Sequence, residues 1–132
     1  MKWMSKGKKK KYSLKRFFKS FGYGFKGFVS AIKTEQNLLI ELVIAIIVII
    51  SGIFLKLTTV EWAIIVLTIG LVIFAELINT SIEYTVDMAM PEMHPLAKIS
   101  KDVSAAAVLF ASFISIVIGL LIFLPKIIDL FK

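Results

Sequence analysis

The sequence has 132 residues, of which 58% are hydrophobic, a formal net charge of +7 and no cysteine. This composition excludes an ordinary soluble domain, a disulfide-stabilised secreted domain and a disordered chain. The charge is unevenly placed, because 11 of the 16 basic residues and none of the 9 acidic residues precede position 34. A basic tail ahead of an apolar segment is attracted to an anionic membrane surface, and no nucleic-acid motif accompanies it, so no nucleic-acid partner is expected.

Residues 1–12 are predicted to form this basic tail, and residues 13–33 an amphipathic helix lying on the membrane surface. Apolar residues recur in the second segment at three- and four-residue spacing, as a surface helix requires. They are Leu14, Phe17, Phe18, Phe21, Phe25, Phe28, Val29 and Ile32. Gly22, Gly24 and Gly27 are expected to weaken this helix, either to permit a bend or to let a ligand approach the backbone.

Residues 34–132 are predicted as a transmembrane domain with spans at about 35–57, 60–88 and 99–125, the last ending at Pro125. Each is long enough for a hydrocarbon core of about 30 Å. The basic tail places the N-terminus in the cytoplasm, so three crossings place the C-terminus outside the cell membrane. The predicted fold class is therefore an all-α membrane protein with three transmembrane helices and an N-terminal surface helix.

The third span carries a ladder of small residues at four-residue spacing. Its members are Ala107, Ala111, Ser115 and Gly119. Small side chains let helix backbones approach closely in lipid, so this face is predicted to pack against another helix.

Acidic residues of all three spans fall in one layer near the cytoplasmic side. At a rise of 1.5 Å per residue, Glu41 lies roughly 22 Å inward from Lys56, at the outer end of the first span. Glu76 lies roughly 21 Å inward from Trp62, at the outer end of the second. Glu35, Glu83 and Asp102 lie roughly 31 to 34 Å inward by the same measure. Charges inside a span cost about 2.5 to 3.5 kcal/mol each, which makes them candidates for function.

The second span presents its polar residues as one stripe at helical spacing, namely Glu76, Asn79, Glu83 and Asp87. Such a cluster repels itself unless cations neutralise it or some members are protonated. Carboxylate and amide oxygens suit Mg²⁺, which is usually bound together with substrate phosphates. Lys98 and Lys101 supply positive charge at the same interface, and Arg16 can reach it from the surface helix. Salt bridges between helices are an equally good interpretation of Asp87, Glu92 and Lys98.

Two runs carry a resemblance to a known family. They are ELINTSIEYTVD at 76–87 and HPLAKISKDV at 94–103, and FGYGFKG at 21–27 adds to them. This combination is similar to that of the prokaryotic diacylglycerol kinases, small integral-membrane lipid kinases that include the undecaprenol kinases of Gram-positive bacteria. Gly24 and Ala105 stand where the Gram-negative members tend to have serine. The residues at 94–98 are more similar to those of the Gram-positive branch, which favours a polyprenol substrate.

The resemblance implies a homotrimeric helical bundle whose active sites are shared between subunits. It implies that Glu76 is the general base and that Glu35 and Glu83 bind the metal that carries ATP. Further polar positions of the site would be Asn79, Lys101 and Asp102, and residues near the nucleotide would be Arg16, Tyr23, Lys26, His94 and Lys98. Asp87 would support the site, and Glu41 matches a buried polar position without an assigned role.

The predicted function is transfer of the γ-phosphate of MgATP to the hydroxyl of undecaprenol, giving undecaprenyl phosphate. Phosphorylation of diacylglycerol to phosphatidic acid is the alternative within the family. An alternative of another class is a subunit of an oligomeric ion or proton channel or transporter, with the stripe lining the path. That alternative predicts acids throughout the membrane depth, whereas the outer two-thirds of the spans are apolar.

Overall fold

A computed structural model describes residues 12–132, so nearly all of the predicted basic tail lies outside the described residues. The described chain forms four helices, α1 (Leu14–Thr34), α2 (Gln36–Phe54), α3 (Thr59–Ala89) and α4 (Pro95–Leu130). Three of them, α2, α3 and α4, are long and apolar enough to cross a membrane. The prediction of an all-helical chain with three such helices is confirmed.

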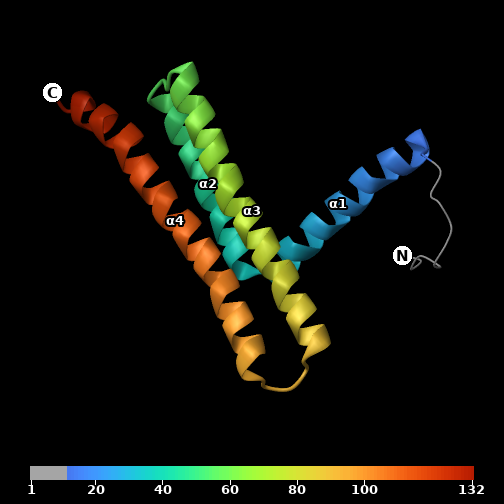
Figure 1. The fold of residues 1–132 in the computed structure, drawn as a ribbon. Helices are drawn as coiled ribbons and strands as arrows, with labels where there is room; N and C mark the ends of the chain where they lie inside the picture. Colours follow the sequence, from blue (N-terminus) through green and yellow to red (C-terminus); the bar gives the residue numbers. More distant parts are fainter. Residues whose placement is uncertain (1–11) are drawn as a thin grey trace.

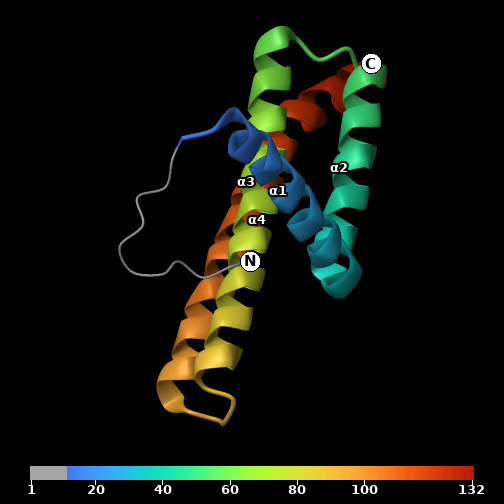
Figure 2. The ribbon, with the colours of Figure 1, turned by 90° about the vertical axis from the view of Figure 1, so that its right-hand side faces the viewer.

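The helices α3 and α4 form a long hairpin and pack together along most of their length, whereas α2 packs mainly on α3 (Figure 1). The hairpin extends beyond the point at which α2 begins, and its closing loop lies at that far end (Figure 2). Helix α1 leaves the bundle where α2 starts and contacts α2 and α3 near that junction. The fold is therefore a three-helix bundle with one branching helix.

Helix α1 is continuous through its three glycines. It begins at Ser13, whose side-chain oxygen accepts a hydrogen bond of 3.4 Å from the backbone N–H of Arg16. Gly22, Gly24 and Gly27 have nothing within 4 Å of the position of a Cβ atom. The expected weakening does not break the helix, because the neighbouring residues keep their backbone hydrogen bonds at a cost of about 1 kcal/mol per glycine.

A tight turn joins α2 to α3 at the predicted outer end of the bundle. Lys56 adopts a left-handed backbone conformation with φ of 55°. Thr58 caps α3 by accepting a hydrogen bond of 3.2 Å from the N–H of Glu61. A Cβ atom on Gly52 would lie 2.8 Å from the ring of Trp62, so glycine is what allows the two helices to approach here.

Helix α4 is longer than the predicted third span. It starts at Pro95, where the Nδ1 atom of His94 accepts a hydrogen bond of 3.1 Å from the N–H of Leu96. It continues through Pro125 to Leu130, so the prediction that Pro125 ends the helix is wrong. Proline removes one backbone hydrogen bond without ending a helix whose neighbours hold it. The next residue, Lys126, supplies such a contact because its Nζ lies 3.1 Å from the Oε2 of Glu61 on α3.

Few side chains of the described residues are buried within the chain. The largest fully buried ones are Leu38 and Glu76, whereas most isoleucines, leucines and phenylalanines of α2, α3 and α4 are exposed. An apolar surface of this extent needs lipid or another protein chain to cover it.

Candidate active site

Glu76 lies at the centre of the polar layer. It is on the face of α3 that meets its neighbours, with 1% of its surface exposed, and its Oε2 atom has no hydrogen-bond partner. Its carboxylate interacts electrostatically with those of Glu35, Glu41 and Glu83. The structure therefore brings three predicted acidic residues close to the buried carboxylate of Glu76, whose Oε2 atom has no hydrogen-bond partner.

Glu35 reaches this level because it is the single residue between α1 and α2. Its backbone is extended, with φ of −111° and ψ of 105°, and its N–H donates to the carbonyl of Ala31 at 2.8 Å. Its side chain makes no capping hydrogen bond to α2, although it stands at the N-terminal cap position. The carboxylate of Glu35 is thus not used in holding the junction together.

Asn79 follows Glu76 by one helical turn on the same buried face of α3. Its Oδ1 accepts a hydrogen bond of 2.7 Å from the hydroxyl of Ser104 on α4. The next residue, Thr80, is also buried, and its hydroxyl has no partner. Sequence reasoning missed both Ser104 and Thr80. The signal for Ser104 was available, because it continues the small-residue ladder one turn before Ala107 and seven residues before the buried Ala111.

The basic residues of this region already have acidic partners. Lys101 on α4 forms an ion pair with Asp87 on α3, which links the two helices between the acidic layer and the α3–α4 loop. Lys101 also interacts electrostatically with Glu83. Lys98 pairs with Asp102 one turn further along α4 at 2.6 Å. Asp87 therefore makes an ion pair between helices, as the salt-bridge interpretation describes, whereas the ion pair of Lys98 lies within α4.

Other predicted site residues are not brought to Glu76 within one chain. Arg16, Tyr23 and Lys26 are exposed on α1, the helix that branches from the bundle. Asp102 is exposed on α4, and His94 is exposed at the cap of that helix. Within residues 12–132 no three His, Cys, Asp or Glu side chains converge as they would around a metal ion. Within the described residues, the predicted site residues therefore do not all gather around Glu76.

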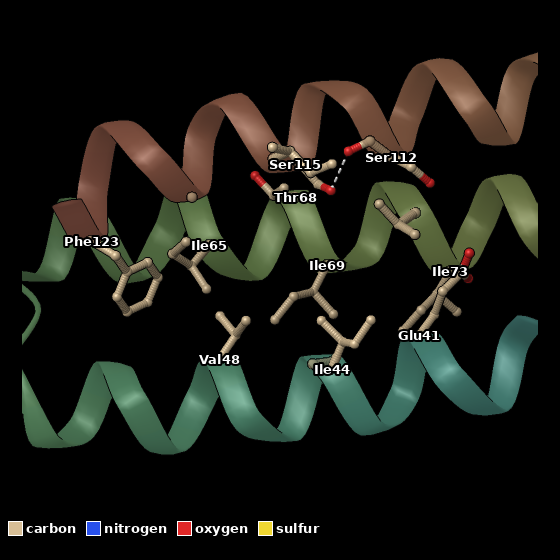
Figure 3. A pocket seen from close by; sticks show the side chains of 14 residues that line it. Glu41, Ile44, Val48, Ile65, Thr68, Ile69, Ile73, Ser112, Ser115 and Phe123 are labelled. Carbon is tan, nitrogen blue, oxygen red and sulfur yellow. Dashed lines mark hydrogen bonds between the residues drawn. The ribbon is translucent and has the colours of Figure 1, made fainter.

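A cavity of about 360 Å³ begins beside this layer and runs between α2, α3 and α4 toward the outer end (Figure 3). Glu41 lines its inner end and Phe123 its outer end, and between them Ile44 and Val48 of α2 face α3. Hydroxyl groups of Thr68 and Ser115 line it as well, but each donates to a carbonyl of its own helix. The cavity is therefore largely apolar, with a carboxylate at the end nearest Glu76.

Comparison with known proteins decides the family. The family described as prokaryotic diacylglycerol kinase matches residues 22–123, which include the acidic layer and both runs that carry the resemblance. The chain belongs to the prokaryotic diacylglycerol kinase family. The predicted relationship is confirmed.

Similar members of this diacylglycerol kinase family come from several bacteria. The chain is 47% identical to the undecaprenol kinase of Bacillus subtilis over 113 residues, which cover 86% of this chain and 92% of that protein. It is 36% identical to a diacylglycerol kinase of Synechocystis over 112 residues, covering 84% of this chain and 64% of that protein. It is 28% identical to the diacylglycerol kinase of Escherichia coli K12 over 102 residues, covering 77% and 84% of the two chains.

Proposed function

We propose that the protein is a membrane lipid kinase that transfers the γ-phosphate of ATP to the hydroxyl of undecaprenol. The observation that carries this proposal is the buried Glu76 carboxylate, with an unpartnered oxygen, in the same layer as Glu35 and Glu83. The substrate choice is supported by 47% identity to an undecaprenol kinase over most of both chains.

In the proposed reaction, Glu76 accepts the proton of the lipid hydroxyl while the hydroxyl oxygen attacks the γ-phosphorus of ATP. The bond between the γ-phosphorus and the bridging oxygen breaks, and ADP leaves with that oxygen. A positioned general base typically contributes 10² to 10⁴-fold to such a step. The sequence has no Gly-x-x-x-x-Gly-Lys loop and no protein-kinase signature, so Mg²⁺ and basic side chains are proposed to hold the phosphates. Lys101 is proposed to offset charge on the transferring group.

Magnesium is proposed to be held by Glu35 and Glu83 together with the phosphates of ATP. Mg²⁺ commonly uses one or two carboxylates plus substrate phosphates and water, which fits a layer in which the described residues offer no larger cluster. The metal would neutralise phosphate charge. The side chain of Glu35 suits this role because it makes no capping hydrogen bond to α2. The amide of Asn79 adds a further polar group to the layer, one turn from Glu76 on the same buried face of α3.

The membrane placement supports a lipid hydroxyl as the acceptor. We propose that α1 is amphipathic and lies in the cytoplasmic interface, with its exposed Phe17, Phe18 and Phe21 at the headgroup boundary. The N-terminus would be cytoplasmic, close to an anionic surface, and the C-terminus outside. A hydroxyl at headgroup depth would then meet Glu76, while the chain of the lipid extends beside the apolar cavity at Glu41.

The enzyme is further proposed to act as a homotrimer whose active sites are shared. This accounts for Arg16, Tyr23, Lys26, His94 and Asp102, which one chain does not gather around Glu76. Mixing tests it, because trimers assembled from inactive Glu76→Gln and Asp102→Asn chains contain some sites with both native residues only if the two come from different subunits. Recovered transfer is expected, and no recovery in assembled mixed trimers would contradict the sharing of these two residues.

The substrate is tested by transfer of radiolabelled γ-phosphate from ATP to undecaprenol and to diacylglycerol, each in the same mixed micelles. Faster labelling of undecaprenol is expected. Equal rates would contradict the preference for the polyprenol while leaving a lipid kinase. Transfer to neither lipid, with ion flux through reconstituted vesicles without ATP, would replace the kinase by the channel alternative.

A further inference from the structure

Ser104 differs from the other helical hydroxyl groups that the structure pairs. Within residues 12–132, most of the Ser and Thr hydroxyls that donate a hydrogen bond donate it to a carbonyl of their own helix, which is the usual behaviour of these residues in helices. They are Ser20, Thr34, Ser51, Thr68, Thr85 and Ser115. Ser104 instead donates across the interface to the Oδ1 atom of Asn79 at 2.7 Å. Both residues are more than nine-tenths buried, so water does not compete for this bond.

The bond fixes which end of the Asn79 amide faces the reaction. An asparagine amide presents an acceptor on one side and two donors on the other. With Oδ1 turned toward Ser104 on α4, the NH₂ group is turned away from Ser104. Asn79 stands between Glu76 and Glu83, three residues after one and four before the other, which are neighbouring positions on a helix. Carboxylates accept hydrogen bonds only, so they favour the NH₂ group on their side and disfavour the oxygen.

We propose that Ser104 is a positioning residue, which holds the Asn79 amide with its NH₂ group available to the acceptor hydroxyl and the transferring phosphoryl group. This role rests on the proposed lipid kinase function and adds a residue that no part of the predicted site contained. Within the described chain the NH₂ group donates to no protein acceptor, which leaves both of its hydrogens for substrate.

The rotation of α4 selects this hydroxyl. Ala105, the residue after Ser104, is exposed on α4. Ser104 is one residue earlier, which turns its side chain by about 100° around the helix, onto the face buried against α3. The hydroxyl that faces the polar stripe in this chain therefore comes from position 104.

The test compares Ser104→Ala and Ser104→Thr with the wild type in the phosphate-transfer assay, with kcat and the KM for ATP and for lipid measured separately. Ser51→Ala is the control, since it removes a helical hydroxyl that lies outside the cavity and the acidic layer and bonds only its own helix, to the carbonyl of Ile47 at 2.8 Å. We expect Ser104→Ala to lower kcat about tenfold, equivalent to about 1.4 kcal/mol, with the KM for ATP nearly unchanged. Ser104→Thr keeps the hydroxyl and should restore most of kcat, and Ser51→Ala should match the wild type.

A role in packing alone predicts the opposite order, because alanine fits the space of serine and threonine adds a methyl group. Wild-type kcat in Ser104→Ala, or a larger loss in Ser104→Thr than in Ser104→Ala, would overturn the proposal. In the background of Asn79→Ala, a further loss from Ser104→Ala would also overturn it, because Ser104 should act only through Asn79. If Ser104→Ala does not fold, Ser104→Cys keeps the volume with a weaker donor, and wild-type kcat in that variant would overturn the role.

The outcome is separable from that of the proposed function. A wild-type protein that phosphorylates neither lipid would overturn the function and the role together. An active wild type with an equally active Ser104→Ala would overturn only the role.

Discussion

Glu76→Gln removes the proposed general base while keeping the size of the side chain. Glu76 is 1% exposed and its Oε2 atom has no partner, so the amide occupies the same space without displacing a protein hydrogen bond. A general base contributes about 10² to 10⁴-fold to the rate, so kcat should fall by at least about 10²-fold. The range of 10² to 10⁴-fold is equivalent to about 2.7 to 5.4 kcal/mol in the activation free energy.

The same substitution should not destabilise the fold. It replaces one of four carboxylates that interact at one level of the bundle with a neutral group. A charge inside a span costs about 2.5 to 3.5 kcal/mol, so stability should stay unchanged or rise by up to about 3 kcal/mol. The assay is phosphate transfer to undecaprenol, together with thermal unfolding and the oligomeric state in the same detergent.

Glu61→Gln is the control, because Glu61 is also a partly buried carboxylate of α3 but lies about 22 Å from Glu76 along the helix. It should keep wild-type kcat. Turnover at more than a tenth of the wild-type rate in a folded, assembled Glu76→Gln protein would refute the assignment of the general base. A fall in kcat of equal size in both variants would show that charge on α3, rather than proton transfer, limits the rate.

Two further predictions concern the outer end of the bundle. Gly52→Ala should destabilise the protein by about 1 to 3 kcal/mol, since its Cβ would lie 2.8 Å from the ring of Trp62. Thermal unfolding checks it against Gly70→Ala, where nothing lies within 4 Å and stability should not fall; equal effects would contradict the contact. Breaking the ion pair between Glu61 and Lys126, whose side chains are 27% and 25% exposed, should cost no more than about 1 kcal/mol. Exchanging the two charges should restore part of that loss, and a double variant no more stable than Lys126→Glu alone would argue against the pair.

The sequence predicted the parts of the fold that depend on local pattern. Long apolar runs determined three helices, and the polar residues of the second run share a helix face, as Glu76 and Asn79 do in the structure. The end of the last helix was predicted wrongly because proline was taken as a terminator. In the structure the residues after Pro125 are held from another helix, through Lys126 and Glu61, and such a contact is invisible to local rules.

The candidate site was predicted by residue type and depth but not by partner. Depth alone placed Glu35, Glu41, Glu76, Glu83 and Asp102 in one layer. The structure brings the first four together, whereas Asp102 is exposed and pairs with Lys98. The small-residue ladder marks the packed face of α4, which Ser104 continues, but it does not tell which side chain of α3 that hydroxyl meets. The bond from Ser104 therefore required the structure.

The unequal lengths of the helices have a mechanical consequence for the acidic layer. Helix α2 has 19 residues and spans about 28 Å, whereas α3 and α4, with 31 and 36 residues, span about 46 and 54 Å. The α3–α4 hairpin therefore continues as a stiff rod past the beginning of α2, and the layer around Glu76 is framed by these two continuous helices, with Glu35 at the single-residue junction between α1 and α2. The backbone of these helices is already ordered by its hydrogen bonds before any substrate arrives from lipid or from water. Binding at this layer should therefore cost the backbone little conformational entropy.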